Sequence, residues 1–195
     1  MKFTVEKKEI SEALSLVASV AEKRQSIPVL SNILLKAEKE GLTLIATDLE
    51  IELTFKIPKI ELDSEGETTV SARKLADLVR SVPEDTVLTF ELLESQLEIS
   101  ALKFQADFST LPVGDFPVAE ISEFEREVAL PGKELAELIE KTSFAMASQD
   151  VRYYLNGILL EVSPSQINVV ATDGHRLAWA SCKIKTDFTD EKIII

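Results

Sequence analysis

The sequence predicts an α+β protein built from a repeated domain, in which two helices pack on one face of a largely antiparallel sheet. Three observations support this prediction. The tripeptide Ala46–Asp48 returns as Ala171–Asp173, 125 positions later. Its surroundings return at the same offset, so that Ile33–Leu35 is matched by Ile158–Leu160. Helical stripes and alternating strand-like segments follow one another in the same order in both copies.

The first copy begins with a predicted strand at Phe3–Val5 and a helix from about Lys8 to Lys23. The apolar residues of this helix keep the three-to-four spacing of a single buried stripe. Pro28 then ends any helical tendency. Three strands are expected next, at Val29–Ala37, Leu42–Ala46 and Ile51–Ile57, separated by Gly41 and by a turn at Asp48–Glu50.

A second helix is expected to be capped by Ser71 and to run to about Ser81, where Pro83 stops it. Leu111–Pro117 contains two prolines and a glycine, and an acidic stretch follows it, which is typical of a joint between domains. We expect about two helices and about seven strands per domain. Between the second helix and the joint, strands are expected at Val87–Leu92, Leu97–Ala101 and Leu102–Ser109.

The second copy restarts with a predicted strand at Glu127–Leu130 and a helix from about Gly132 to Ala147. Its helix carries an apolar stripe like that of the first copy. Strands are then expected at Tyr153–Val162, Ile167–Thr172 and Arg176–Lys185.

The repeat offset places Ile193–Ile195 on Thr68–Val70, just before the second helix of the first copy. We therefore expect residues 1–125 to form one complete domain, and residues 126–195 to form the N-terminal part of a second. The chain is then a piece of a longer protein. The alternative is a complete protein whose second domain has degenerated.

Composition favours a soluble globular protein, with 45% hydrophobic and 28% charged residues. No apolar stretch is long enough for a membrane span, and the N-terminus lacks a signal-peptide core. A lone cysteine, Cys182, suits the reducing cytoplasm. One Cys and one His cannot supply a Cys/His metal site, so neither a metal nor a cofactor is expected.

The net charge of -13 excludes a uniformly basic, affinity-driven nucleic-acid binder. Any role on DNA has to rest on a local positive surface or on geometry. Such a surface is predicted on the second helix, where Arg73, Lys74 and Arg80 are opposed only by Asp77.

Two further residues match each other across the repeat, Arg24 and Gln149. Both lie in the loop that leaves the first helix of their copy, and both side chains can hydrogen-bond phosphate oxygens. For Arg24 there is a simpler alternative, since a cation at the C-terminal end of a helix complements the helix dipole.

An enzyme is the less favoured interpretation. The sequence has no Gly-rich phosphate loop and no nucleophile elbow. Asp173 and His175 could join a serine in a hydrolase triad. However, Thr172–Gly174 has the composition of a turn between two strands, where Asp and Gly are expected for backbone reasons alone.

The second copy departs from the first at two places. Arg152–Leu155 replaces the plain Ile27–Leu30, and Gly174–Leu177 replaces Leu49–Glu52. Adjacent residues on a strand face opposite sides, so the paired tyrosines of the first run cannot both lie in the core. Their rings could stack on bases or line a peptide groove. We therefore predict a binding site specific to the second copy.

These runs carry a resemblance to a known family. The segments Met1–Glu6, Ala46–Glu50, Leu111–Pro117, Gln149–Gly157 and Ala171–Ala178 resemble the bacterial DNA polymerase III β subunit family, the replicative sliding clamps. The similarity covers the whole chain, and its motifs are long and specific.

The resemblance implies three domains of one topology per subunit and a head-to-tail dimer that forms a ring of six domains. The third domain would be absent from this chain. Duplex DNA would pass through the ring without sequence preference, and the clamp would act as a non-catalytic, cytoplasmic processivity factor. The net negative charge of the chain is compatible with a ring that encloses DNA, because such a ring needs no strong attraction to phosphate, and a weakly bound duplex can slide through it. Other partners would be the DNA polymerase III α subunit, the clamp loader, and further polymerases and repair proteins that bind through short linear peptides.

By the same resemblance, residues of three surfaces are assigned. Arg24, Gln149, Tyr153 and Tyr154 would approach DNA, and Arg73, Lys74 and Arg80 would face the central hole or the neighbouring subunit. The groove for linear peptides would include Arg152, Tyr154, Leu155, Thr172, Gly174, His175, Arg176 and Leu177. The dimer interface would use Leu78, Val82, Ala106 and Phe108, although the small Ala106 departs from the family pattern. The alternative function is a stand-alone peptide-binding adaptor that does not encircle DNA.

Overall fold

The computed structural model describes residues 1–21, 27–119, 127–185 and 190–195, and the chain divides into two compact units. Unit 1 is Met1–Ile121 and unit 2 is Ser122–Ile195. The boundary expected between residues 125 and 126 falls outside the described residues and stays a prediction.

Unit 1 contains two antiparallel sheets, ordered β5-β1-β7-β8-β9 and β4-β3-β2-β6. Its elements in chain order are β1 (Lys2–Glu6), α1 (Lys7–Val20), η1 (Pro28–Ser31), β2 (Asn32–Glu38), β3 (Gly41–Thr47), β4 (Glu52–Ile57), β5 (Glu61–Ser64), β6 (Gly66–Ser71), α2 (Ala72–Ser81), β7 (Val87–Leu93), β8 (Gln96–Ala101), β9 (Phe104–Ser109) and η2 (Val113–Asp115).

The expectation of one sheet with about seven strands is wrong for unit 1. The chain passes from the first sheet to the second after β1, returns at β5 and crosses again at β6, where Gly66 pairs with Ala37. Gly66 has a φ of +157°, and a Cβ added to it would lie 2.8 Å from the Cβ of Met1. A glycine is therefore needed where the chain changes sheet.

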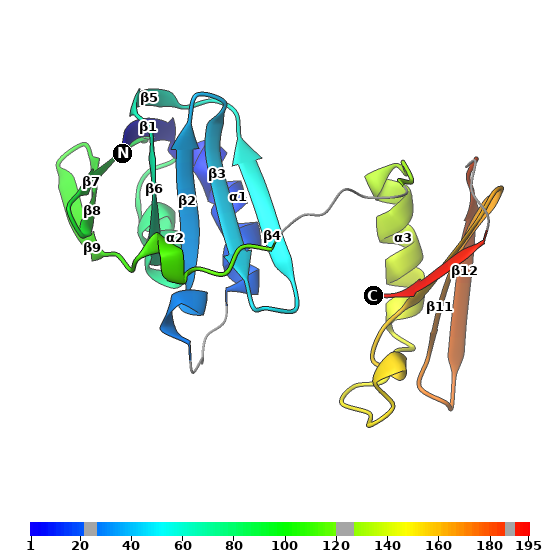
Figure 1. Cartoon of the computed structure of the whole chain (residues 1–195). Helices are drawn as coiled ribbons and strands as arrows, with labels where there is room; N and C mark the ends of the chain where they lie inside the picture. The colour runs from blue at the N-terminus through cyan, green and yellow to red at the C-terminus, as the bar shows by residue number, and fades with distance from the viewer. Residues whose placement is uncertain (22–26, 120–126, 186–189) are drawn as a thin grey trace. The chain divides into compact units, whose positions relative to one another are not determined.

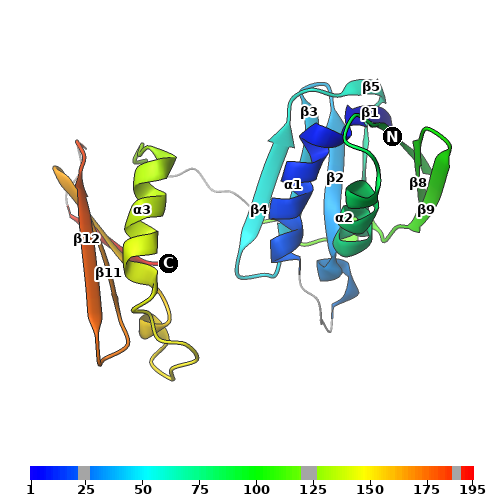
Figure 2. The same ribbon diagram turned by 180° about the vertical axis from the view of Figure 1, so that it is seen from behind.

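Both helices of unit 1 pack on the same side of the β4-β3-β2-β6 sheet, as the two opposite views show (Figures 1 and 2). The main core lies between helices and sheets, and it includes Ile10, Leu14 and Val17 of α1 and Leu75 of α2. Ser71 caps α2 as predicted, because its Oγ accepts a hydrogen bond of 3.5 Å from the backbone N–H of Lys74.

The opposite side of this sheet is covered by the segment after β9, drawn in green in Figure 1. Phe116 of this segment is buried against Val29, Leu34 and Ile45, with Val113 packed beside them. The segment was predicted only as an irregular joint. Its role in unit 1 is to cover the outer face of the sheet, which we define as the face away from the helices.

Unit 2 repeats this plan with one helix and one sheet in the described residues, and α3 lies on one side of the sheet (Figure 2). The sheet order is β12-β11-β10-β13. Adding 125 to β4, β3, β2 and β6 gives these same four strands in the same order, so the predicted repeat is confirmed. The elements are α3 (Gly132–Ser143), η3 (Tyr153–Leu155), β10 (Leu159–Ser163), β11 (Gln166–Thr172), β12 (Leu177–Lys183) and β13 (Glu191–Ile194).

Several expected elements differ in the structure. The strand predicted from Val29 begins at Asn32, because Pro28–Ser31 forms a 3-10 helix. Residues 127–130 form no strand. The corresponding strand of unit 1, β1, pairs with both β5 and β7. The helix predicted to reach Ala147 ends at Ser143. The strand predicted from Tyr153 begins at Leu159, because Tyr153–Leu155 forms a 3-10 turn.

Candidate functional site

The turn between β11 and β12 is built by the side chains of Thr172 and Asp173. Thr172 Oγ1 accepts a hydrogen bond from the Gly174 N–H at 3.1 Å and donates to the Arg176 carbonyl at 2.7 Å. Asp173 Oδ1 accepts from the backbone N–H groups of His175 and Arg176, both at 2.9 Å. Gly174 has the left-handed φ of +88° that glycine tolerates best.

The Asp173 carboxylate is therefore part of the turn. The backbone N–H of Arg176, then that of His175, hold the pKa of Asp173 down at about 2, and the Arg176 side chain adds to this. What the carboxylate accepts from His175 is a backbone hydrogen bond. This geometry supports the turn interpretation over a hydrolase triad.

The loop between α3 and β10 is closed by a second aspartate. Asp150 receives a forked pair of hydrogen bonds from Arg152, Nε to Oδ1 at 3.0 Å and Nη2 to Oδ2 at 2.9 Å. Its pKa falls to about 2, chiefly because of this Arg152 side-chain bond. Asn156 completes the loop, since its amide bonds both the N–H and the carbonyl of Asp150 at 2.9 and 3.0 Å. Gln149 takes a φ of +58° at the start of this loop.

The two loops meet at the Arg152 guanidinium. A Cβ added to Gly174 would lie 3.5 Å from Arg152 Nη2, so the arginine rests against the turn. Tyr153 and Tyr154 project from the loop, 85% and 61% exposed, whereas Leu155 is buried. The prediction excluded the core for only one of the two tyrosines, whereas both lie outside it; the cause is the 3-10 turn and not strand alternation.

Phe144, directly after α3, is a part of this surface that the sequence reasoning missed. It is 60% exposed, and the Arg176 guanidinium carbon lies 5.6 Å from its ring centroid. Arg176 is thus held between this ring and Asp173, to which its Nε donates at 2.9 Å. Comparison of the two copies could have indicated this residue, because the aromatic Phe144 stands where unit 1 has the small, polar Ser19.

The resulting surface, which we call the unit 2 site, consists of residues 144, 149–155 and 172–177. Its two arginines are each paired with an aspartate, so the charges of these four groups cancel. Leu177 is 66% exposed beside them. An apolar surface with oriented donors and little net charge suits a peptide better than a polyanion.

The cations predicted in unit 1 lie on α2 and are exposed. Asp77 pairs with Arg80 at 3.0 Å and more loosely with Arg73 at 3.8 Å. Lys74 stands in the first turn of the helix. A hollow of about 460 Å³ beside these groups is lined mainly by alanines and serines of α1, α2 and the residues that adjoin them. Arg24 lies outside the described residues.

The residues predicted for the dimer interface divide into two groups. Ala106 and Phe108 lie on β9, the edge strand of its sheet, facing Ile99 and Leu97 of β8. Leu78 and Val82 pack in or against the core of unit 1. Leu78 is only 9% exposed, so its contribution to any interface is small.

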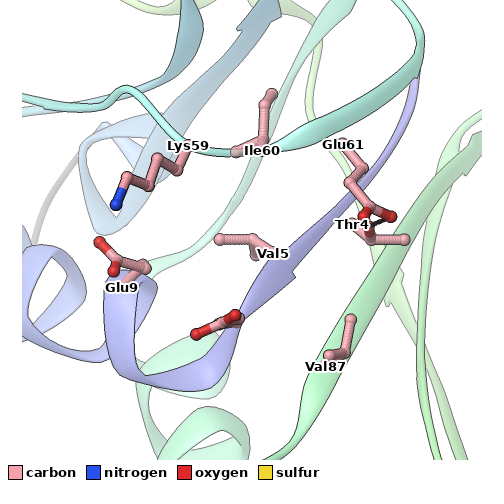
Figure 3. Close-up of a pocket in the computed structure, with 8 residues that line it drawn as sticks. Thr4, Val5, Glu9, Lys59, Ile60, Glu61 and Val87 are labelled. Atoms are coloured by element: carbon pink, nitrogen blue, oxygen red, sulfur yellow. Dashed lines mark hydrogen bonds between the residues drawn. The ribbon is translucent and has the colours of Figure 1, made fainter.

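A further hollow of about 470 Å³ lies in unit 1 between β1, the start of α1 and residues 59–61 (Figure 3). Val5 and Ile60 line it, with Glu9, Lys59 and Glu61 around them (Figure 3). None of the residues predicted for a site lines it. In the described parts of the chain, no cluster of three or more His, Cys, Asp or Glu is arranged to hold a metal ion.

Within the described residues, no helix is both long and apolar enough to span a membrane.

Two family models match the chain. Residues 1–120 match the N-terminal domain of the DNA polymerase III beta subunit, and residues 129–195 match its central domain. Among curated relatives, beta sliding clamps of Pseudomonas putida, Vibrio cholerae and Escherichia coli are 44%, 42% and 38% identical over the whole chain. The chain spans 53% of each of these relatives.

Solved structures agree with the family models. The DNA polymerase III subunit beta of Pseudomonas aeruginosa is similar with a TM-score of 0.95 at 42% identity, covering all of this chain and 53% of that one. The Caulobacter crescentus pol III beta is similar with a TM-score of 0.87 at 38% identity, covering 95% of this chain and 51% of that one. This chain therefore belongs to the DNA polymerase III beta subunit family, with an N-terminal and a central-domain segment.

Proposed function

We propose that this chain is the first domain and part of the second domain of a DNA sliding clamp. The complete ring encloses duplex DNA, and the protein acts in the cytoplasm without catalysing a reaction. The observation that carries the proposal is the match of the whole chain to beta sliding clamps at 38–44% identity. The repeated sheet order in the two units supports it, because a ring is built most simply from copies of one domain.

The electrostatics favour enclosure over adhesion. The chain carries a net charge of -13, and its exposed α2 cations form only a local positive surface. Phosphate contacts alone would give weak, salt-sensitive binding. A closed ring needs no strong contact, so we propose that α2 and, in unit 2, Gln149, Tyr153 and Tyr154 face the duplex.

A topological experiment tests this function. The chain extended to the length of its relatives is loaded with a clamp loader onto nicked circular DNA and onto the same DNA after linearisation. We expect retention on the circle at a salt concentration that removes the protein from the linear DNA. Equal loss from both forms would favour the adaptor alternative, which binds without enclosing.

We further propose that the unit 2 site captures short linear peptides of polymerases, the clamp loader and repair proteins. Apolar Leu177 would contact the peptide, while Arg152 and Arg176, fixed by their aspartates, would orient it. The DNA polymerase III α subunit is the partner we expect first. β9, with Ala106 and Phe108, would pair with the neighbouring subunit of the ring.

Leu177→Ser tests the peptide site. Ile51→Ser is the matched control, because Ile51 is a comparably exposed apolar residue, 58% against 66%, beside the equivalent turn of unit 1. Titration with a fluorescent peptide from the α subunit should show roughly tenfold weaker binding for Leu177→Ser and unchanged binding for the control. Equal effects of the two substitutions would contradict the assignment.

A further inference from the structure

One side of α2 carries a row of three charged residues. Arg73, Asp77 and Arg80 follow one another at intervals of four and three positions, so their side chains lie on the same side of the helix. Asp77 stands between the two arginines. Its Oδ1 accepts a hydrogen bond from Arg80 Nη1 at 3.0 Å, and its Oδ2 lies 3.8 Å from Arg73 Nε. One carboxylate is therefore shared by two guanidinium groups.

The stability of α2 gives little reason for an aspartate at this position. The side chains of Arg73, Asp77 and Arg80 are 85%, 58% and 72% exposed, and ion pairs this exposed contribute little to folding. An arginine four residues before the acid is also the weaker of the two orders on a helix. Aspartate is a poor helix former, and Asp77 lies outside the first turn, the part of a helix in which an acidic side chain is stabilising. What Asp77 does to the two arginines is the better explanation.

The same three residues line the hollow of about 460 Å³ that is bounded by α1 and α2. These two helices lie side by side on one side of their sheet (Figure 2). One water molecule takes about 30 Å³, so a hollow of this size admits a phosphate group with part of its hydration shell. The other lining residues are small, which keeps the space open: Ala18, Ala21, Ser31, Ser71, Ala72 and Ala76.

Phosphate is the ligand for which these arginines are suited. A guanidinium group binds phosphate oxygens through paired N–H donors, and two such groups border one hollow here. Asp77 opposes this binding in two ways. It accepts the hydrogen bond that Arg80 would otherwise give to the anion, and its negative charge lies in the lining of the same hollow. A phosphate group has to compete with this carboxylate for both arginines.

We propose that Asp77 weakens the contact of α2 with the DNA backbone and thereby keeps the duplex free to slide. This inference rests on the proposed function, in which α2 faces the duplex. When a phosphate leaves Arg73 or Arg80, the Asp77 carboxylate replaces it as hydrogen-bond partner, so that passing from one phosphate to the next costs little. Without the carboxylate the two arginines become stronger phosphate anchors, which raises both the affinity for DNA and its dependence on salt.

Asp77→Asn in the whole chain tests the inference, because asparagine keeps the size of the side chain and removes its charge. Asp63→Asn is the matched control, since Asp63 is exposed on β5, in the other sheet of unit 1, and the change in net charge is the same. A fluorescently labelled duplex is titrated with each protein at several salt concentrations. We expect roughly three- to tenfold tighter binding for Asp77→Asn, with a log–log salt slope steeper by about 1, and less than about twofold change for Asp63→Asn. Circular dichroism checks that both variants are folded.

The same substitutions in the complete ring measure sliding. The chain extended to the length of its relatives is loaded onto circular DNA, and the diffusion of the labelled ring along the DNA is followed. The Asp77→Asn ring should diffuse at least about threefold more slowly than the wild-type and Asp63→Asn rings, in proportion to its tighter binding.

Four results would overturn the inference. Equal effects of the two substitutions in the titration would show that only the net charge of the chain matters. Weaker binding of Asp77→Asn would show that Asp77 orients the arginines toward phosphate. Retention of the wild-type ring on the circle with equal diffusion of all three rings would contradict this inference alone. Loss of the wild-type ring from the circle as readily as from linear DNA would contradict the proposed function, and this inference with it.

Discussion

Leu49 and Gly174 occupy the same left-handed position in the same turn, 125 residues apart, with φ angles of 78° and 88°. Part of the surrounding hydrogen-bond pattern is also shared. Thr47 Oγ1 accepts from the Leu49 N–H at 3.0 Å, as Thr172 does from Gly174 at 3.1 Å. In unit 1 a residue with a β-carbon, Leu49, therefore adopts a left-handed backbone conformation that glycine adopts in unit 2.

The first prediction follows from this strain. Leu49→Gly should stabilise unit 1 by about 0.5–1 kcal/mol, because a left-handed L-residue costs about 1–2 kcal/mol and the greater entropy of glycine in the unfolded chain offsets part of the gain. Leu49 is 59% exposed, so little burial is lost. Urea unfolding followed by amide signals of β3 measures the change, with Trp179 fluorescence as a reporter of unit 2.

Gly174→Leu is the reciprocal variant. The space is sufficient, since a Cβ would make ordinary contact with Arg152 at 3.5 Å. Only backbone strain then opposes it, and unit 2 should lose about 1 kcal/mol. If both variants destabilise their units, the turns differ in a way that their hydrogen bonds do not reveal.

The second prediction concerns the stability of the fold at low pH. The pKa of Asp173 is lowered in the folded chain to about 2 from an unfolded value near 3.9. A lowered carboxyl pKa stabilises the fold above about pH 4, and that contribution disappears as the pH falls toward about 2. Asp150 behaves in the same way, with its pKa also at about 2.

The measurement is the pH dependence of the amide shifts of His175 and Arg176, the two donors to Asp173. In the wild type their acid transition should have its midpoint near pH 2. Asp173→Asn keeps an acceptor oxygen and should abolish that transition. A wild-type midpoint close to 4 would show that the carboxylate does not hold the turn in solution.

The third prediction compares the two hydrogen-bond partners of the buried Lys7 ammonium group. Lys7 is 4% exposed, and its Nζ donates to the Val82 carbonyl at 2.8 Å and to Glu84 at 2.7 Å. Lys7→Met leaves the carbonyl without this donor and should destabilise unit 1 by about 1–3 kcal/mol. Glu84→Gln should change stability by less than about 1 kcal/mol, because the Glu84 side chain is 79% exposed.

The same urea experiment, read from unit 1 amide signals, compares the two variants. A larger loss for Glu84→Gln than for Lys7→Met would contradict the view that the carbonyl is the partner that matters.

The fourth prediction tests Phe144. Phe144→Leu removes the ring that faces the Arg176 guanidinium but keeps the bond from Arg176 to Asp173. Exposed cation–π contacts are worth about 0.5–1 kcal/mol, so peptide binding at the unit 2 site should weaken roughly two- to fivefold. Phe144→Tyr keeps the ring and serves as control. Identical affinities for Leu and Tyr would show that Phe144 does not position Arg176 for binding.

Much of the fold could be predicted because strands and helices have periods that the sequence displays. The repeat could be predicted because Ala46–Asp48 and its surroundings return 125 positions later, and β11 occupies the positions obtained by adding 125 to β3. The turn at Thr172–Gly174 was also predictable, since Asp and Gly suit its backbone for local reasons.

The loop that carries Tyr153 and Tyr154 could not be predicted in this way. It is held by the Asn156 side chain on Asp150 and by the Ala147 N–H on the Leu155 carbonyl at 2.9 Å. Such bonds join residues six or eight apart in the sequence and leave no periodic pattern. Placement of Phe144 against Arg176 was hidden for a related reason, because it depends on α3 ending at Ser143.

The fifth prediction concerns the segment that covers the outer face of unit 1. Phe116→Ala should destabilise unit 1 by about 3 kcal/mol, because a buried ring that contacts Leu34 and Ile45 is replaced by a cavity. Val118→Ala, at a residue 45% exposed in the same segment, should change stability by less than about 0.5 kcal/mol. Amide exchange in β2 and β3 should accelerate only in Phe116→Ala. Protection that stays unchanged in this variant would mean that the hydrogen bonds of Thr69 with Leu111 hold the segment without the ring.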